Sequence, residues 1–269
     1  MTCGRSDLTK VPDIEIADLT VRYRTAEGAV TALQDVSMSI PRRSFVSIVG
    51  PSGCGKTTLL KVLSGVLKAS SGTVEFDGSS IEKTNLSGKI GYVFQRPLLL
   101  PWRTALQNVA LTSEVAKKSL TKIEREAAAR HWLGLAGLAA FEACLPHELS
   151  GGMQQRVSLC RALAFQPPLL LMDEPFAALD EITRETMQGE LLKLWSASES
   201  SVLFITHSIG EAVLLSERIV IMSARPGTVE EVIDVPFPRP RSEEVRATAE
   251  FTELVEYIRR KLRNNKKPH

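Results

Sequence analysis

Paired cysteines, an excess of one charge and long apolar runs are all missing from this sequence. Its 269 residues contain four cysteines with neither C-x-x-C spacing nor a partnering histidine cluster, namely Cys3, Cys54, Cys144 and Cys160. A disulfide framework or a zinc site is therefore not expected, and this cysteine usage is typical of a reducing cytoplasm. The 33 basic and 31 acidic residues nearly balance, unlike the one-sided basic charge of a dedicated nucleic-acid-binding protein.

Nowhere do about 18 apolar residues follow one another, which is the length that a membrane-spanning helix requires. The first residues, MTCGRSDLTKVPD, carry charges where a signal peptide needs an apolar segment. If the protein serves a membrane process, we therefore expect another polypeptide to supply the span.

The apolar residues follow two different patterns, which predict two kinds of sheet within one domain. Alternation with polar residues, typical of an antiparallel sheet with one wet face, occurs in residues 14–23 (with a slip near Asp18), 36–40 and 74–76. Nearly unbroken apolar runs, typical of parallel strands buried on both faces, occur in residues 45–49, 168–172, 201–206 and 218–222. Helical stretches between these runs indicate a doubly wound α/β core.

The rest of the chain is predicted to be largely helical. Residues 97–165 show no strand pattern, and their alanine- and charge-rich part predicts a helical insertion. Prolines punctuate residues 226–240, and a helix follows in which Phe251, Leu254, Val255, Ile258 and Leu262 share one face. We expect residues 13–240 to form the main unit, followed by a C-terminal helix and basic tail over residues 241–269.

The stretch SFVSIVGPSGCGKTTLL contains a complete phosphate loop, G-x-x-x-x-G-K-[ST], between a buried strand and a helix. The glycines allow the backbone to wrap a phosphate, and the helix N-terminus directs N–H groups and partial positive charge at the anion. Lys56 is expected to reach the outer phosphates, and the Thr57 hydroxyl to bind Mg²⁺. The predicted ATP-binding residues of this loop are Gly50, Pro51, Ser52, Gly53, Cys54, Gly55, Lys56, Thr57 and Thr58. Cys54 is either a reactive thiol or a small side chain tolerated at a variable position, and we favour the second.

An acidic pair follows a buried strand in PLLLMDEPF, at the edge where α/β sheets hold their ligands. Asp173 suits Mg²⁺ coordination together with Thr57 and water, and Glu174 suits a general base that polarises the attacking water. Gln95 and His207 also follow strands, which places them near Mg²⁺, the water or the γ-phosphate. The alternative for each of these side chains is a structural or solvated strand end.

A second glycine-containing segment, ELSGGMQQRVSLCRAL, opens a helix at Gly151 and Gly152. No lysine follows the glycine pair and no strand precedes it, so the segment does not predict a separate nucleotide site.

In combination, these motifs resemble the ATP-binding subunits of ABC (ATP-binding cassette) transporters over nearly the whole chain. The ordered set is GPSGCGKTT (50–58), VFQ (93–95), LSGGMQQR (149–156), LLLMDEP (169–175), AALD (177–180) and THS (206–208). The resemblance implies the ABC ATPase fold, which is a P-loop NTPase core with a mostly parallel sheet, an N-terminal antiparallel β subdomain and a helical insertion. It also implies ATP and Mg²⁺ as cofactors and ATP hydrolysis as the activity.

The resemblance assigns further roles that the residues alone do not. Tyr23 would stack on adenine, the alternative being an ordinary strand tyrosine. Gln95 would sense the γ-phosphate, contribute to the Mg²⁺ site and face the membrane partner, and His207 would hold the γ-phosphate. Asp180 would cross a dimer interface, and the residues that would complete the site of the opposite subunit are Ser150, Gly151, Gly152 and Gln154.

Two departures from the family pattern are Ala177, where serine is frequent, and Ser208, where aspartate is common. Neither removes a group assigned to phosphate or metal, so hydrolysis is still expected. The segments LLLPWRTALQNV (98–109) and MSARPGTVEEVIDVPFPRPR (222–241) resemble importers of nitrate, sulfonates, taurine and similar solutes. That likeness implies a second ATP-binding subunit, transmembrane permease subunits, a periplasmic solute-binding protein and a place on the cytoplasmic face of a bacterial inner membrane.

The main alternative is a soluble ABC ATPase that acts on nucleic acid or ribosomes. Such proteins share these motifs but carry long coiled-coil insertions or two fused cassettes, whereas this chain has one cassette and a helical insertion of ordinary length. A non-hydrolysing binding module is disfavoured because Glu174 and His207 are both present. The basic tail RRKLRNNKKPH could touch anionic lipid, but a solvated helix end is preferred.

Overall fold

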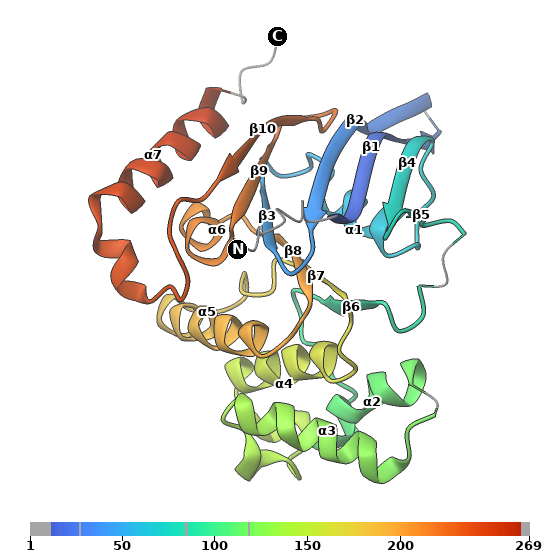
Figure 1. Cartoon of the computed structure of the whole chain (residues 1–269), viewed down its shortest axis with the longest axis vertical. Helices are drawn as coiled ribbons and strands as arrows, with labels where there is room; N and C mark the ends of the chain where they lie inside the picture. Colours follow the sequence, from blue (N-terminus) through green and yellow to red (C-terminus); the bar gives the residue numbers. More distant parts are fainter. Residues whose placement is uncertain (1–11, 27, 84–85, 118, 265–269) are drawn as a thin grey trace, which may run out of the picture.

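The computed structural model describes residues 12–26, 28–83, 86–117 and 119–264. Two sheets occupy the upper part of the molecule in Figure 1, and a group of helices lies below them. Cys3, the N-terminal stretch before residue 12 and the end of the basic tail lie outside the described residues.

The antiparallel sheet has the strand order β2-β1-β4-β5. Its strands are β1 (Pro12–Thr25), β2 (Gly28–Pro41), β4 (Ser71–Phe76) and β5 (Ser79–Ser80). The alternation predicted from the sequence is confirmed, since Ile14 and Ile16 are buried and Glu15 is exposed. The slip near Asp18 is a true irregularity, with φ of 50° at Asp18 and a register shift between Ile16 and Leu19.

The second sheet is the predicted buried parallel sheet, in the order β10-β9-β3-β8-β7-β6. Its strands are β3 (Phe45–Val49), β6 (Ile90–Val93), β7 (Leu169–Asp173), β8 (Ser201–Ile205), β9 (Arg218–Met222) and β10 (Val229–Asp234). Every residue of β3 and β8 is buried, as expected for strands covered on both faces. β10 pairs antiparallel with β9 at one edge, and the sequence did not predict it.

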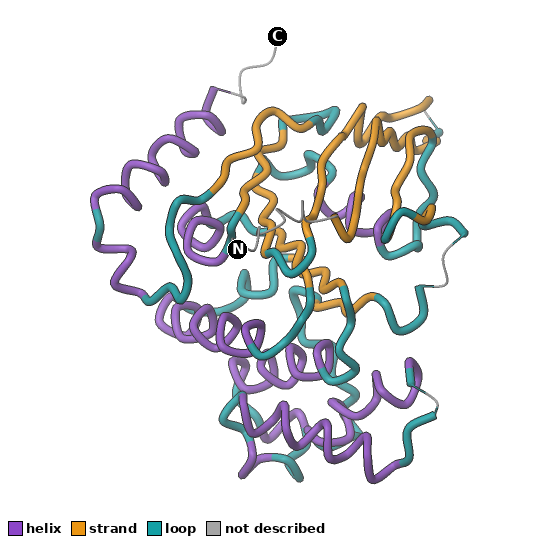
Figure 2. The backbone as a smooth tube through the Cα atoms, viewed as in Figure 1, coloured by secondary structure: helices purple, strands orange, loops and turns teal. Residues whose placement is uncertain are grey.

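Residues 97–165 form helices and turns, as predicted (Figure 2). Residue 118 is not described, and none of the others lies in a strand. The region contains α2 (Ala105–Ala116), α3 (Lys122–Leu135) and α4 (Gly151–Leu163), with short 3₁₀ turns η1 (Ala139–Phe141) and η2 (Pro146–Glu148). Thr104 and Thr121 begin α2 and α3 with capping boxes, each side chain accepting the N–H three residues ahead.

The remaining helices cover the parallel sheet. They are α1 (Lys56–Leu63), α5 (Glu181–Ser196), α6 (Ile209–Leu215), the 3₁₀ turn η3 (Glu243–Ala247) and α7 (Ala249–Asn264). The predicted apolar face of α7 is confirmed: Phe251 and Ile258 are buried in a cluster with residues of α6 and β9, and Leu254, Val255 and Leu262 pack against it. No helix among the described residues has the length and apolar character needed to cross a membrane.

The core fixes the position of α1. Alternate residues of β3 face opposite ways, so Phe45 packs with the helices α4 and α5, whereas Val46 and Ile48 pack with α1 and the antiparallel sheet. Helix α1 therefore shares one apolar cluster with both sheets, and the loop before it is held at the carboxyl edge of β3.

Candidate functional site

The loop between β3 and α1 has the backbone of a phosphate-binding loop. Gly53 and Gly55 have φ of 76° and 95°, in the left-handed region that favours glycine. A Cβ on Gly55 would lie 2.5 Å from Leu33 Cδ2 and 2.8 Å from Ala32 O. Glycine is therefore required at position 55 for two reasons, the backbone conformation and the close packing of β2 against the loop.

Lys56 lies inside this loop and is only 5% exposed. Its Nζ donates to Gly50 O at 2.9 Å and to Pro51 O at 3.0 Å. The ammonium group is thus held at the concave side of the loop, beside the N-terminus of α1. Backbone N–H groups, the helix dipole and a buried cation together make a site for an anionic ligand.

Cys54 is 1% exposed, with its Sγ 3.7 Å from Lys56 Nζ. A buried thiol is shielded from reagents, which favours the packing interpretation of this residue over a reactive one.

Asp173 ends β7 beside the phosphate loop. Thr57 Oγ1 donates to Asp173 Oδ1 at 3.4 Å. Burial raises the pKa of the Asp173 carboxyl above its usual value, while the hydrogen bond from Thr57 acts in the opposite direction. A carboxylate and a hydroxyl oxygen side by side are the hard ligands that Mg²⁺ prefers, so this pair fits the metal that the motifs imply.

Glu174 and His207 come from the ends of neighbouring strands, β7 and β8, and meet directly. His207 Nε2 lies 2.6 Å from Glu174 Oε1. The Glu174 side chain is 21% exposed and that of His207 is 46% exposed. Both can therefore reach a ligand in the adjoining cavity, and the histidine can orient the carboxylate.

Lys56, Thr57, Glu174 and His207 line one cavity of about 560 Å³, and Asp173, the partner of Thr57, is not among its lining residues. Tyr23 also lines it, and its hydroxyl lies 3.2 Å from Thr58 Oγ1. The lining residues are Tyr23, Val30, Thr31, Ala32, Ser52, Gly53, Gly55, Lys56, Thr57, Thr58, Glu174, His207 and Arg225. The cavity thus has an aromatic side chain, a cationic loop and a carboxylate–imidazole pair around one space, an arrangement suited to a nucleotide.

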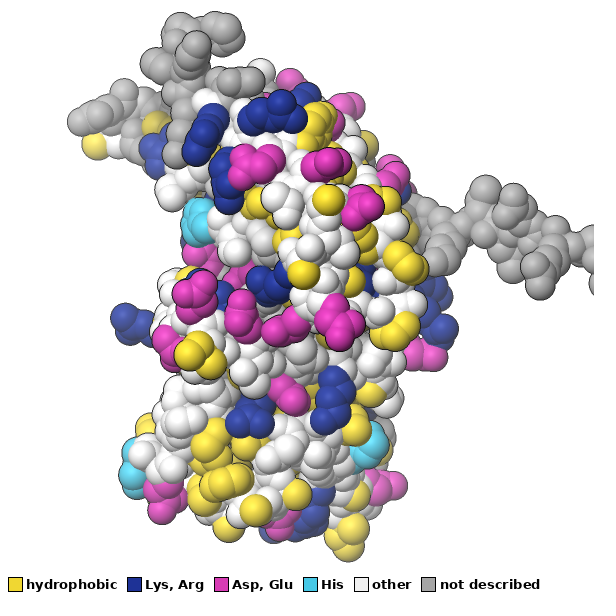
Figure 3. Space-filling view, turned by 90° about the vertical axis from the view of Figure 1, so that its left-hand side faces the viewer, with side chains coloured by type: hydrophobic (Ala, Val, Ile, Leu, Met, Phe, Trp, Pro, Cys, Tyr) yellow, Lys and Arg dark blue, Asp and Glu magenta, His cyan; other side chains and the backbone are white. Residues whose placement is uncertain are grey.

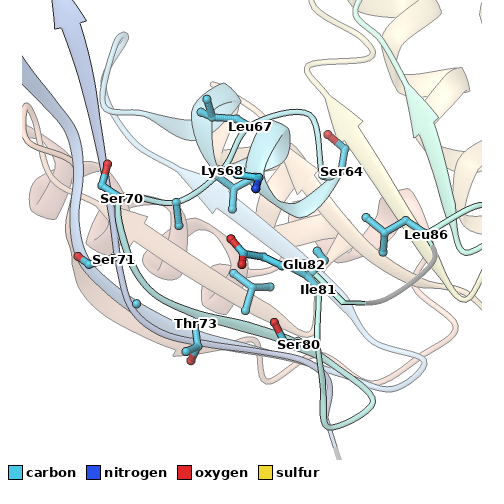
Figure 4. A pocket seen from close by; sticks show the side chains of 15 residues that line it. Ser64, Leu67, Lys68, Ser70, Ser71, Thr73, Ser80, Ile81, Glu82 and Leu86 are labelled. Carbon is cyan, nitrogen blue, oxygen red and sulfur yellow. The ribbon is translucent and has the colours of Figure 1, made fainter.

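A slightly larger cavity, about 640 Å³, lies between the end of α1 and strands β4 and β5 (Figure 4). Ser64, Lys68, Thr73, Ser80 and Glu82 are among the side chains around it. None of its lining residues belongs to the phosphate loop or the acidic pair, so it is not the candidate site.

Several predicted site residues do not line the 560 Å³ cavity. Ser150 caps α4, its Oγ accepting from Met153 N at 3.3 Å, and Gln154 donates to Pro146 O at 2.9 Å. Asp180 caps α5, accepting from Thr183 N at 2.9 Å, and Gln95 is exposed beyond the end of β6. The chain therefore leaves Ser150, the adjoining Gly151 and Gly152, and Asp180 outside its own cavity.

Two groups near the site were missed in the sequence. Arg225 lines the cavity although it is far from the phosphate loop in the chain. Glu211, on α6, is 5% exposed and accepts a hydrogen bond from Thr206 Oγ1 at 2.5 Å, next to His207. The Pro226-Gly227 dipeptide after Arg225 is a turn signal, but no local pattern shows where such a turn packs.

Comparisons with known proteins agree with this geometry. The family model described as "ABC transporter" matches residues 33–177. The taurine import ATP-binding protein TauB of Rhizobium johnstonii is 46% identical over 86% of this chain and 88% of its own length. The nitrate import ATP-binding protein NrtD of Synechococcus elongatus is 42% identical over 82% of this chain and 81% of its own.

A solved dimeric ATP-binding cassette, in a post-hydrolysis state bound to ADP and Pi, superposes with a TM-score of 0.72 at 35% identity. The match covers 84% of this chain and all of that one. With the fold, the phosphate loop and these relatives taken together, the chain belongs to the ABC transporter family and is one of its ATP-hydrolysing, ATP-binding cassettes.

Proposed function

We propose that this chain is the ATP-hydrolysing subunit of a bacterial importer of small anionic solutes, such as nitrate, sulfonates or taurine. The observation that carries the proposal is that Lys56, Thr57, Glu174 and His207 line one cavity, while Asp173 accepts a hydrogen bond from Thr57 beside it. The solute class is supported by the taurine and nitrate import proteins among the relatives.

Each side chain at the cavity has a task in ATP hydrolysis. Lys56 and the backbone N–H groups of the phosphate loop bind the phosphates, and Tyr23 stacks on adenine. Thr57 and Asp173 hold Mg²⁺, which supplies positive charge to the phosphate oxygens. Glu174 accepts the proton of the attacking water, and His207, 2.6 Å away, orients that carboxylate and contacts the γ-phosphate.

The cavity is completed by a second cassette in this proposal. Ser150, Gly151, Gly152 and Gln154 lie at the N-terminus of α4, where the helix dipole and the N–H groups of the first turn suit a phosphate, yet they do not line the cavity of their own chain. They would face the Lys56 and Glu174 of the opposite subunit, with Asp180 at the interface. Because ATP favours closure only through its higher affinity for the closed pair, hydrolysis would reopen the dimer.

Closure would reach permease subunits through the exposed segment around Gln95, with a periplasmic solute-binding protein delivering the solute. The chain would then act on the cytoplasmic face of the inner membrane, residues 13–240 forming the cassette. Figure 3 shows Asp and Glu side chains in a band across the middle of one face, and hydrophobic side chains over the helical region below. That mixed face does not favour the alternative, an ATPase acting on nucleic acid or ribosomes.

The test is reconstitution with the membrane subunits that co-purify with the chain. ATP hydrolysis in liposomes should rise when nitrate, taurine or an alkanesulfonate is supplied with its binding protein, and should not rise with a neutral sugar. A Lys56→Ala complex provides the background without ATPase activity. Stimulation by nucleic acid or ribosomes, with no response to any of these solutes, would overturn the proposal.

A further inference from the structure

The loop between β9 and β10 is a turn closed by hydrogen bonds of its own residues. Ser223 Oγ donates to Pro226 O at 2.9 Å and accepts from Thr228 N at 2.9 Å. Ser223 N also donates to Thr228 O at 3.0 Å, closing the base of the turn. Arg225 therefore lies in a turn that is closed by hydrogen bonds between Ser223, Pro226 and Thr228.

Gly227 fastens this turn to the phosphate loop and to β2. Its N–H donates to Ala32 O at 3.0 Å, and its carbonyl accepts from Gln34 N at 2.9 Å. A Cβ at position 227 would lie 1.9 Å from Cys54 O, a backbone atom of the phosphate loop. The two loops are thus in direct backbone contact although they are separated by most of the chain.

The guanidinium of Arg225 lies over Gly53. Arg225 Nε donates to Gly53 O at 3.0 Å, and a Cβ on Gly53 would be 2.8 Å from Arg225 Nη2. Among the described residues its Nη groups have neither a hydrogen-bond acceptor nor an acidic partner. Arg225 lines the same cavity as Lys56, Thr57 and Tyr23.

We propose that Arg225 is a second cationic ligand of the nucleotide, its Nη groups donating to a phosphate oxygen. The planar guanidinium, with one edge tethered to Gly53 O, presents donors in a fixed orientation that matches phosphate oxygens. Because the turn is pinned at Gly227, little conformational freedom is lost when the contact forms. The inference rests on the proposed function, since it requires that the cavity binds a nucleotide.

The test compares five variants of the full chain by calorimetric titration with the magnesium complex of AMP-PNP, a non-hydrolysable ATP analogue. Arg225→Ala should weaken binding about tenfold at low salt, equivalent to ~1.4 kcal/mol. Arg225→Lys keeps the charge and should lose less, whereas Arg225→Gln keeps a donor for Gly53 O and should lose as much as alanine. Arg260→Ala removes an exposed charge from α7, away from the cavity, and should bind normally. The tenfold loss should shrink at high salt because Arg225 is exposed.

The outcomes separate this inference from the proposed function. Lys56→Ala serves as the reference, and wild-type affinity in that variant would overturn the nucleotide site itself. Weak binding by Lys56→Ala with wild-type affinity in Arg225→Ala would overturn only the role of Arg225. Full affinity in Arg225→Gln beside a loss in Arg225→Ala would show a tether to Gly53 and contradict a phosphate contact. Thermal unfolding of each nucleotide-free variant checks that the fold is retained.

Discussion

Replacing Glu174 with glutamine should stop hydrolysis while leaving ATP binding and the fold intact. Glutamine has the shape of glutamate and retains an oxygen that can accept from His207 Nε2, 2.6 Å away in the structure. It cannot accept the proton of the attacking water. Loss of a general base lowers a rate by about 10²–10⁴, so the activation free energy should rise by ~2.7–5.4 kcal/mol.

The fold should hardly respond to this change, because volume and hydrogen bonding are conserved. A difference below ~1 kcal/mol in a chain of this size shifts the melting temperature by less than about 4 °C. The assay is phosphate release per chain at saturating MgATP, with Glu253→Gln on the exposed face of α7 as the matched control. If Glu174→Gln hydrolyses ATP at the control rate, Glu174 is not the base and the reasoning from its position fails.

Three other changes test separate parts of the structure. Tyr23→Phe keeps the ring and removes only the hydroxyl contact with Thr58, so the affinity for ATP should be nearly unchanged. Tyr23→Ala should weaken that affinity about tenfold in a calorimetric titration. Equal losses in the two variants would disprove stacking. Phe204→Ala removes a fully buried ring whose centroid lies 5.6 Å from that of Phe45 and 5.9 Å from that of Phe176. Urea unfolding should show that the free energy of unfolding falls by ~3–5 kcal/mol. A fall below ~1 kcal/mol would contradict this packing. Burial raises the pKa of the Glu211 carboxyl, so the folded state holds its proton more tightly than the unfolded state does. The stability that protonated Glu211 contributes is present at low pH and is lost as the pH rises through the raised pKa. The unfolding free energy of the wild type relative to Glu211→Gln should therefore fall from about pH 4 upward. A rise would contradict a raised pKa at Glu211.

The phosphate loop and the buried strands could be predicted because each depends on local sequence. Lys56 and Thr57 follow glycines at fixed spacing, and Asp173 ends an apolar run, so the carboxyl edge of the sheet was the expected place for them. The contact between Thr57 and Asp173 follows from the parallel sheet order, which the alternation of strands and helices implied.

Strand β10 was not predicted because its half-buried and exposed positions do not coincide with its apolar and polar residues. Glu231 points toward the protein, where Tyr257 Oη donates to it at 2.6 Å and Lys261 Nζ lies 2.8 Å away, while Val232 is exposed. Partners supplied by α7 thus allow a charged residue on the inner face, and no local pattern contains those partners.

Arg225 shows the same limit at the site. The contact between Arg225 and Gly53 joins residues from opposite ends of the cassette, and it depends on how the β9–β10 turn packs against the phosphate loop. For Ser150 the sequence motif and the family resemblance were needed instead, because one chain alone does not bring that residue to its own cavity.

A site built from two chains can be tested by mixing two variants that are each inactive alone. Lys56→Ala destroys the phosphate loop of its own chain, and Ser150→Arg blocks the N-terminus of α4 that would serve the partner. About half of randomly formed dimers are mixed, and each would contain one intact site built from both chains. The mixture should therefore recover about a quarter of the wild-type ATPase rate, whereas each variant alone should be inactive. A mixture as inactive as its components, or an active Ser150→Arg homodimer, would contradict it.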